Sequence, residues 1–324
     1  MAYDLEFEKP LAELDRKIQK LESKGERLKP EEREQIASMK AELHKKTAGL
    51  YSKLTSWQSV QVARHRDRPY MLDYIKLICD DYFELRGDRR FGDDRAIQGG
   101  LVQLDGRTVM LIGNQKGRDT KEKLECSFGM PHPEGYRKAL RMMQQAQKFG
   151  MPIVTLIDTA GASPDLSSEE RGQSQAIAEN LLVMSQLRVP VVAAVIGEGG
   201  SGGALALGVA NRLLMLEFAI YTVAAPEAAA SILWRDTVYA PQAAEAMKVN
   251  ARELYQLGLV DELVPEPLGG AHRDHEAAAR ALKAAICKHL DELSKLDQDE
   301  LVRQRHEKFR AIGKFSEEPL PVLS

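Results

Sequence analysis

The chain has 324 residues, of which 44% are hydrophobic and 29% charged, as in an ordinary globular protein. Its formal net charge is −3, with 45 Lys and Arg against 48 Asp and Glu, so no overall basic field favours nucleic acid or an anionic membrane. No apolar run approaches the roughly 18 residues of a membrane helix, and the acidic, polar N-terminus is not typical of a signal peptide. The length allows one large domain, or one domain with an extension.

The three cysteines, Cys79, Cys126 and Cys287, are far apart and odd in number, which suits a reducing cytoplasm. They form no C-x-x-C metal site, and the seven histidines show no spacing typical of metal ligands. We therefore expect a cytoplasmic protein with no metal site in this chain.

The N-terminal segment, residues 1–60, predicts a helical hairpin. Its apolar residues recur at spacings of three and four, and the segment Gly25 to Pro30 separates two such stripes. Charged residues fill the other faces, so we expect the hairpin to pack its stripe on the main body or on another chain. The stripes consist of Leu11, Leu14, Ile18 and Leu21, then Ile36, Met39, Leu43, Leu50 and Leu54.

Residues 61–310 predict an α/β domain, followed by a loosely ordered tail after Phe309 that comprises residues 311–324. The dipeptide Asp105-Gly106 between two apolar runs predicts a β-hairpin. Repeated β-turn-α units place ligand sites at the carboxyl ends of the strands. We expect helices over 71–85, 133–149, 168–186, 203–210, 226–234, 241–247 and 276–293, and strands over 97–104, 108–113, 152–157, 189–196, 213–216 and 220–223.

The most informative stretch, residues 195–209, leads from a buried strand through glycines into a helix. Backbone N–H groups at the start of such a helix point to where an anion can bind. An oxyanion hole and a phosphate cradle both use this geometry. The glycines are Gly199, Gly200, Gly202 and Gly203, with Ser201 between them.

Other interpretations of this stretch fit less well. The residue after the last glycine is Ala204 rather than the Lys of a P-loop. The pattern G-x-G-x-x-G does start at Gly197, but the acidic partner that it needs is found only as Glu217 within an apolar run. Ser201 has no nearby histidine that would make it a nucleophile. Close packing of a helix on a sheet remains an alternative explanation of the small residues.

A second loop of small residues, 158–165, follows the strand that precedes the glycine strand. Two neighbouring strands therefore end in loops where backbone can approach a ligand. Asp158 is a candidate general base, although an aspartate at a strand end also caps the next helix or binds loop amides.

Two basic clusters complete the candidate site residues. Lys116 and Arg118 follow a strand and would lie at the mouth of the same cleft, where they suit phosphate or carboxylate groups. Arg86, Arg89 and Arg90 form the second cluster. Plain solvent exposure explains either cluster equally well.

Seven strings spread over nearly the whole chain form a recognisable set. They are QKGRDTKEK (115–123), FGMP (128–131), PEGYRKA (133–139), EERGQS (169–174), VIGEGGSGGA (195–204), ASILW (230–234) and PEPLGGAHR (265–273). In this combination the sequence resembles the carboxyltransferase alpha subunit of bacterial heteromeric acetyl-CoA carboxylase.

The resemblance implies a crotonase-like α/β fold, a superhelix of β-β-α units, and a cytoplasmic α2β2 heterotetramer. It implies transfer of carboxylate from carboxybiotin, held on a separate biotin carboxyl carrier protein, to acetyl-CoA. The product would be malonyl-CoA, in the first committed step of fatty acid synthesis. Biotin carboxylase and a beta subunit with a four-cysteine zinc site would be partners, and ATP and nucleotide binding are further family attributes.

The resemblance also implies roles for single residues. In the family, a pair matching Gly202 and Gly203 stabilises negative charge on the ureido oxygen of biotin through backbone N–H groups. The ureido anion then takes a proton from the acetyl group, so no catalytic triad is expected, and an equivalent loop of the beta subunit stabilises the enolate. The residues expected to bind substrate are Gly161, Ala162, Gly199, Gly200, Ser201, Lys116 and Arg118.

Two loops depart from the family pattern. The usual Asp-Thr-Pro-Gly-Ala-Tyr-Pro-Gly is Asp-Thr-Ala-Gly-Ala-Ser-Pro-Asp over 158–165, with changes at Ala160, Ser163 and Asp165. The usual Ser-Pro-Glu-Gly-Cys-Ala is Ala-Pro-Glu-Ala-Ala-Ala over 225–230, which includes Ala228. Both loops are expected to line the biotin cleft.

Three alternative functions stay open at this point. One is a biotin-dependent decarboxylase subunit, and another is a different crotonase-fold acyl-CoA enzyme such as a hydratase. A hydratase needs paired acidic residues, and the glycine stretch supplies only Glu198. The third is a non-enzymatic scaffold or regulatory chain that binds nucleic acid or a partner, whose signature would be a basic face.

Overall fold

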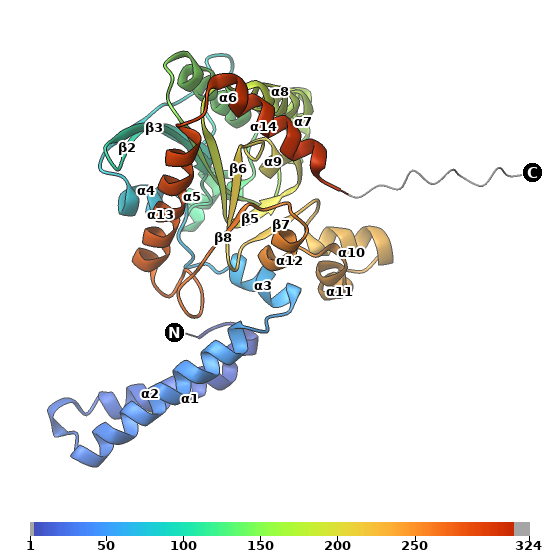
Figure 1. Cartoon of the computed structure of the whole chain (residues 1–324). Helices are drawn as coiled ribbons and strands as arrows, with labels where there is room; N and C mark the ends of the chain where they lie inside the picture. The colour runs from blue at the N-terminus through green and yellow to red at the C-terminus, as the bar shows by residue number, and fades with distance from the viewer. Residues whose placement is uncertain (1–2, 314–324) are drawn as a thin grey trace, which may run out of the picture.

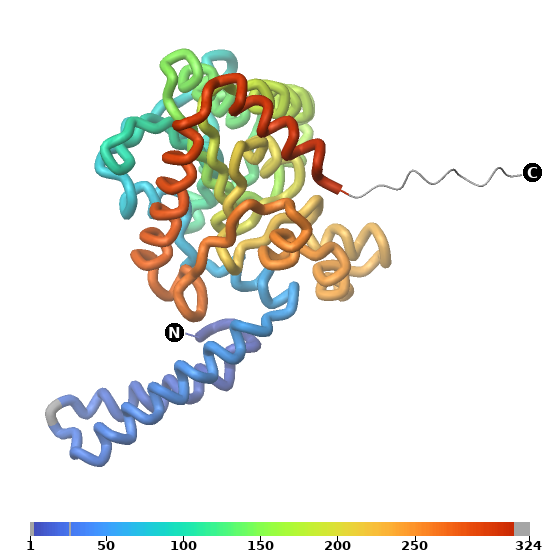
Figure 2. The backbone as a smooth tube through the Cα atoms, in the orientation of Figure 1, coloured from blue at the N-terminus to red at the C-terminus, as the bar shows by residue number. Residues whose placement is uncertain are grey.

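The computed structural model describes residues 3–313 and shows an α/β body from which a helical hairpin projects (Figure 1). The hairpin consists of α1 (Lys9–Glu22) and α2 (Pro30–Tyr51), as the sequence predicts. The backbone trace shows the two helices running side by side away from the body (Figure 2).

The hairpin buries part of its apolar stripe between its own helices. Ile18 on α1 is 2% exposed and Ile36 on α2 is 8% exposed within this single chain. The expectation that the whole stripe needs the main body or another chain is therefore wrong for these positions. At its base the hairpin is held by Tyr51, whose hydroxyl donates to Glu8 at 2.7 Å and whose ring meets Phe218 edge to face.

The body is built on one mixed sheet with the strand order β1-β2-β3-β4-β5-β6-β8, to which β7 adds by pairing with β5. The first three strands are antiparallel, and β3, β4, β5, β6 and β8 run parallel. The strands are β1 (Tyr82–Glu84), β2 (Ile97–Leu104), β3 (Arg107–Asn114), β4 (Ile153–Thr159), β5 (Val191–Gly200), β6 (Arg212–Leu216), β7 (Ile220–Thr222) and β8 (Glu262–Val264). Asp105 and Gly106, both with positive φ, make the predicted turn between β2 and β3.

Helices cover the sheet and complete the core. Helix α6 (Pro133–Lys148) packs on β2 and β3, and α13 (His275–Leu293) packs on β5, β6 and β8. Every residue of β4 and β5 is buried, as expected for central parallel strands. The other helices are α3 (Ser56–Ala63), α4 (Met71–Ile78), α5 (Thr120–Glu125), α7 (Leu166–Glu170), α8 (Gln173–Gln186), α9 (Ser201–Leu205), α10 (Pro226–Trp234), α11 (Ala240–Met247), α12 (Ala251–Gln256) and α14 (Gln298–Ala311).

Several boundaries differ from the prediction for identifiable reasons. The helix expected over 168–186 is divided into α7 and α8 because Gly172 adopts a left-handed conformation, with φ of 81°. Strand β5 continues four residues past Ile196 because residues 198–200 pair with β7. Helix α14 was not predicted, and the part of the expected tail beyond residue 313 lies outside the described residues.

Candidate active site

The glycine loop forms the end of β5 and the first turn of α9. Gly199 and Gly200 are the last residues of the strand, and Ser201 begins the helix with φ of 54°. An α-helix leaves its first four N–H groups without acceptors inside the helix. In α9, whose N-cap is Gly200, the groups of this kind inside the helix belong to residues 201–203, which include the predicted pair Gly202 and Gly203.

The second predicted loop meets the glycine loop through backbone contacts. A Cβ atom on Gly200 would lie 2.1 Å from the carbonyl oxygen of Ala160, and one on Gly203 would lie 2.6 Å from the backbone nitrogen of Ala162. A side chain at either glycine would therefore collide with backbone. By contrast, the nearest atom to a Cβ on Gly202 is a methyl carbon of Ile177, 3.7 Å away. The structure thus brings the two loops together, as the sequence predicts.

A cavity of about 530 Å³ lies directly beside the start of α9. Its wall is mostly apolar, and Ser201 and Gly202 of the glycine loop are among its lining residues. Such a cavity suits a ligand with an apolar ring and one polar group to be fixed by backbone N–H donors. It is lined by Ser201, Gly202, Leu205, Tyr221, Thr222, Val223, Met247, Leu254 and Leu259.

Lys116 is not free to bind a substrate anion, because it is the centre of a buried ion-pair network. Its Nζ lies 2.7 Å from Oδ1 of Asp158 and 2.7 Å from Oε2 of Glu198. Arg64 contacts the other carboxylate oxygen of Glu198 at 2.6 Å and also pairs with Glu227. Lys116 therefore supports the glycine loop through Glu198, the residue directly before Gly199.

The charges of this network stabilise one another. Burial alone would lower the pKa of Lys116, but Asp158 and Glu198 outweigh it and raise the pKa above the ordinary value for lysine. Burial alone would raise the pKa of Glu198, but Lys116 and Arg64 lower it to about 2. Lys116 and Glu198 accordingly both stay charged at neutral pH.

Asp158 binds backbone at the point where the β4–β5 ladder changes register. Its Oδ1 accepts a hydrogen bond from the backbone N–H of Glu198 at 2.9 Å. The register shifts between Ile157 and Thr159, and a Cβ on Gly197 would lie only 2.5 Å from the same Oδ1. This geometry favours the structural role that the sequence left open for Asp158 over the role of general base.

Arg118 also has protein partners, away from the glycine loop. Its guanidinium stacks over the ring of Tyr70, 3.9 Å from the ring centre, and forms an ion pair with Asp73. A further bond runs from Nη1 to the carbonyl oxygen of Arg66 at 2.8 Å. The structure thus does not bring Arg118 together with residues 202 and 203.

Sequence reasoning missed a second buried ion pair under this site. Arg68 pairs with both carboxylate oxygens of Glu266, at 2.9 and 2.5 Å, and donates from Nε to the carbonyl oxygen of Ile196 at 2.6 Å. Both side chains are at most 1% exposed. Glu266 lies in the string 265–273, so the resemblance contained a signal for it, whereas nothing local marks Arg68.

Two of the departures from the family pattern contact each other. The hydroxyl of Ser163 donates to Asp165 at 2.9 Å, and Asp165 also accepts from the backbone N–H of Ser168 at 2.6 Å. These bonds, the backbone N–H of Ser168 first, lower the pKa of Asp165. Ser163 is only 7% exposed, so its side chain supports the loop and does not face the cleft.

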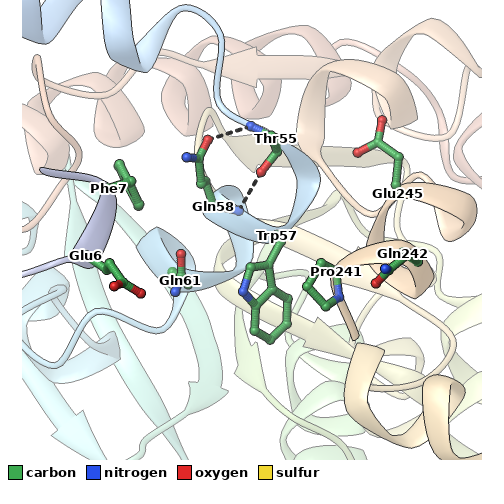
Figure 3. Close-up of a pocket in the computed structure, with 9 residues that line it drawn as sticks. All are labelled: Glu6, Phe7, Thr55, Trp57, Gln58, Gln61, Pro241, Gln242 and Glu245. Carbon is green, nitrogen blue, oxygen red and sulfur yellow. Dashed lines mark hydrogen bonds between the residues drawn. The ribbon is translucent and has the colours of Figure 1, made fainter. Parts of the chain in front are cut away.

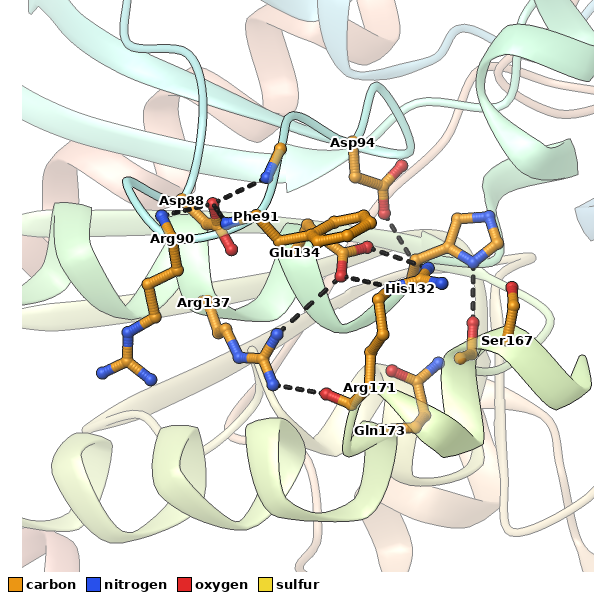
Figure 4. A network of polar contacts seen from close by, with 12 residues as sticks. Asp88, Arg90, Phe91, Asp94, His132, Glu134, Arg137, Ser167, Arg171 and Gln173 are labelled. Atoms are coloured by element: carbon orange, nitrogen blue, oxygen red, sulfur yellow. Dashed lines mark hydrogen bonds and ion pairs between the residues drawn. The ribbon is translucent and has the colours of Figure 1, made fainter.

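Figure 4 shows the polar network next to this loop. His132 contacts the hydroxyl of Ser168 through Nδ1 at 2.7 Å, and its backbone N–H donates to Asp94 at 2.7 Å. Glu134 binds Arg171 at 2.7 Å, which joins the start of α6 to the segment between α7 and α8. The loop 158–165 is joined to this region through Ser163, whose backbone N–H donates to the carbonyl oxygen of Pro131 at 2.9 Å and whose carbonyl oxygen accepts from Gln173 at 3.0 Å.

Another hollow, of about 500 Å³, lies between the N-terminal segment, α3 and α11 (Figure 3). Trp57 and Pro241 form its apolar part, and Glu6 and Glu245 contribute carboxylates. None of the predicted site residues lines it. Within residues 3–313, no helix is long and apolar enough to cross a membrane, and no group of three or more His, Cys, Asp or Glu is placed to hold a metal ion.

Comparisons with solved structures identify the fold. The chain matches a Pseudomonas malonate decarboxylase hetero-tetramer in complex with coenzyme A with a TM-score of 0.59 and 18% identity, over 72% of this chain and 91% of that one. It matches the transcarboxylase 12S structure with methylmalonyl-coenzyme A bound with a TM-score of 0.57 and 20% identity, over 70% of this chain and 42% of that one. These neighbours confirm the predicted crotonase-like fold.

Comparisons with sequences identify the family. The acetyl-coenzyme A carboxylase carboxyl transferase subunit alpha of Halorhodospira halophila is 54% identical over 309 residues, which cover 95% of this chain and 97% of the relative. The subunit of the same name from Geobacter metallireducens is 52% identical over 316 residues, covering 97% and 99%. The family described as acetyl co-enzyme A carboxylase carboxyltransferase-like matches residues 4–313. The chain belongs to this family of carboxyltransferases.

Proposed function

We propose that this chain is the alpha subunit of an acetyl-CoA carboxylase carboxyltransferase and supplies the biotin side of its active site. The observation that carries the proposal is the first turn of α9, whose unpaired N–H groups lie beside an apolar cavity of about 530 Å³. Identity of 54% over nearly the full length of both chains supports the same activity.

The chemistry would come from carboxybiotin, a substrate on a separate carrier protein, which leaves negative charge on its ureido oxygen when the carboxyl group departs. The N–H groups of Gly202 and Gly203 would donate hydrogen bonds to that oxygen. Donors fixed before the reaction stabilise charge without reorganising. Gly203 lies so close to the backbone of Ala162 that a Cβ would be only 2.6 Å from its nitrogen, and this close approach would hold the donors in place.

The network behind the loop fits this role. Lys116 and Glu198 are both held in their charged forms, so neither changes its proton near neutral pH. The ion pair that supports the loop therefore keeps its charges near neutral pH. A site of this kind stabilises an anion without a titrating side chain. This agrees with the expectation from the sequence that no catalytic triad is needed.

The acyl-CoA would be held mainly by a second chain. The cavity beside α9 is lined by no Lys or Arg among the described residues, so nothing in it matches the phosphates of coenzyme A. The proposed assembly is an α2β2 heterotetramer with a zinc-containing beta subunit. Carboxybiotin would arrive on the biotin carboxyl carrier protein after biotin carboxylase has acted.

The test is reconstitution with a candidate beta subunit. We expect the two chains to purify together and to catalyse biotin-dependent decarboxylation of malonyl-CoA, the reverse reaction. We expect this chain alone to be inactive. Turnover without a beta subunit, or a reconstituted pair that decarboxylates malonyl-CoA equally well without biotin, would contradict the proposal.

A further inference from the structure

A basic hollow of about 230 Å³ lies on the outer side of α6, where the loop 86–93 packs against the helix. Water takes up about 30 Å³ per molecule, so the hollow has room for a phosphate-sized group. Four of its seven lining residues are arginines and one is an aspartate. They are Asp88, Arg89, Arg90, Arg137, Leu140, Arg141 and Gln144.

Most of these arginines lack an acidic partner. Within residues 3–313, Arg89, Arg90 and Arg141 have no carboxylate within 4.0 Å, and the nearest one to Arg137 is Glu134, at 3.8 Å. Arg141 instead donates to the carbonyl oxygen of Gly87 at 3.2 Å, which sets its guanidinium beside the loop. In Figure 4 the guanidinium of Arg137 points toward Glu134 and the carbonyl oxygen of Arg171, and the side chain of Arg90 extends away from these residues.

The carboxylates around the hollow mostly have other partners, although the second oxygen of Asp88 is buried without a hydrogen-bond partner. One oxygen of Asp88 accepts three backbone N–H groups of its own loop, at 2.8, 2.9 and 3.0 Å. Asp93 pairs with Lys138 at 2.5 Å, Glu134 pairs with Arg171 at 2.7 Å, and Glu84 pairs with Arg86 at 2.7 Å. Asp88 is the one carboxylate among the lining residues, so the charge of the four arginines is only partly offset within residues 3–313.

The arginines also repel one another. Burial and then the charge of Arg89 lower the pKa of Arg141 below the ordinary value for arginine. Keeping like charges together in a partly buried place costs free energy that a bound anion would recover. A planar guanidinium presents paired N–H donors that match the oxygens of a phosphate.

We propose that this hollow binds the phosphate or pyrophosphate group of a small molecule, at a site separate from the glycine loop. Three arginines without acidic partners suit a multiply charged anion better than a single carboxylate. The two sites share no lining residue. The phosphate could belong to a free nucleotide or to coenzyme A, which carry the same chemistry.

The test measures the binding of inorganic pyrophosphate to the full chain by calorimetry at low ionic strength. We expect saturable binding that weakens as salt is added. The variant Arg90→Gln should weaken binding by about tenfold, the scale of one lost charge-assisted hydrogen bond. Arg141→Gln tests the same site from α6. The matched control is Arg303→Gln on α14, an exposed arginine outside the hollow.

Competition identifies the source of the phosphate. Stronger displacement of pyrophosphate by ADP than by coenzyme A would indicate a free nucleotide, and the reverse would indicate an acyl-CoA. Absence of pyrophosphate binding, or an equal loss in Arg303→Gln and Arg90→Gln, would overturn the proposal. Because binding is measured without a beta subunit, failure of the carboxyltransferase proposal leaves this test unaffected.

Discussion

Glu198 and Lys116 lie 2.7 Å apart behind the glycine loop, and their ion pair joins the ends of β5 and β3. Asp158, at the end of β4, binds the same Lys116 nitrogen at 2.7 Å. One ammonium group thus connects the ends of three neighbouring strands. Both loops of the candidate site start from strands held in this way, so the network sets the position of the backbone N–H groups.

The pH dependence of stability should show the contribution of Glu198. Its folded-state pKa of about 2 is below the ordinary 4.5, so its contribution is fully present above about pH 4.5 and is lost as pH falls toward 2. A shift of this size corresponds to about 3 kcal/mol. At neutral pH we expect the free energy of unfolding of Glu198→Gln to be about 3 kcal/mol lower than that of the wild type. Near pH 2 the two free energies of unfolding should become nearly equal.

The measurement is the free energy of unfolding in urea at a series of pH values. Glu276→Gln, on the exposed surface of α13, is the matched control and should stay within about 0.5 kcal/mol of the wild type. A difference between the wild type and Glu198→Gln that does not change between pH 5 and pH 2 would contradict the assignment.

Substitution of the two central glycines should separate packing from catalysis. Gly203 does not have a positive φ, but its Cβ would meet the backbone nitrogen of Ala162 at 2.6 Å. We expect Gly203→Ala to lose stability and to reduce kcat by about 10²-fold, the scale of a lost oxyanion donor. Gly203→Val should lower both stability and kcat further, because its larger side chain would also displace the backbone around the loop.

Gly202→Ala is the matched control, because a Cβ at this position has 3.7 Å to the nearest atom and the N–H is retained. We expect unchanged folding and a kcat within about tenfold of the wild type, measured in malonyl-CoA decarboxylation with the beta subunit. If both variants behave alike, close approach of the loops is not what fixes the donors.

The departure at Ala160 should affect the biotin side of the reaction. Its carbonyl oxygen faces Gly200, and its own side chain is exposed. Ala160→Pro narrows the conformational range of the loop. We expect a changed KM for free biotin and an unchanged KM for malonyl-CoA in the reverse reaction. Equal changes in the KM for biotin and the KM for malonyl-CoA would show that this loop does not shape the biotin site. Ser163→Tyr would not test the cleft in the same way, because Ser163 is buried against Asp165.

Arg305 should stabilise the fold far more than its neighbour Arg303. It is fully buried on α14 and donates to the carbonyl oxygens of Met184 and Leu187 at the end of α8, at 2.9 and 2.8 Å. Burial lowers the pKa of Arg305 to about 10. We expect Arg305→Met to cost about 3 kcal/mol, because several buried acceptors lose their donor.

Arg303→Met should change stability by no more than about 0.5 kcal/mol, since this exposed side chain pairs with Glu300 and Glu307 on the surface of the same helix. Chemical unfolding of both variants provides the comparison. Equal losses in the two would show that α14 is not held by its buried arginine.

The sequence alone was sufficient to predict features that depend on residues close together in the chain. The apolar stripes predicted the hairpin, Asp105-Gly106 predicted the β2–β3 turn, and the strand-glycine-helix stretch predicted the donors of α9. The seven sequence strings were sufficient to identify the family, because their combination is specific to it. Turn chemistry, periodicity and motif identity are local, so they can be read without knowing which strands become neighbours.

Only the tertiary structure decided what the charged residues do. Lys116 and Arg118 belong to one string, yet one supports the glycine loop through Asp158 and Glu198 and the other stacks on Tyr70. Those partners are as many as 82 residues away, and strand order and the register shift after Ile157 bring them together. The same holds for Gly203, which is required by the backbone of a neighbouring loop and not by its own φ. Ion pairing and close approach depend on distance in space, which a linear sequence does not contain.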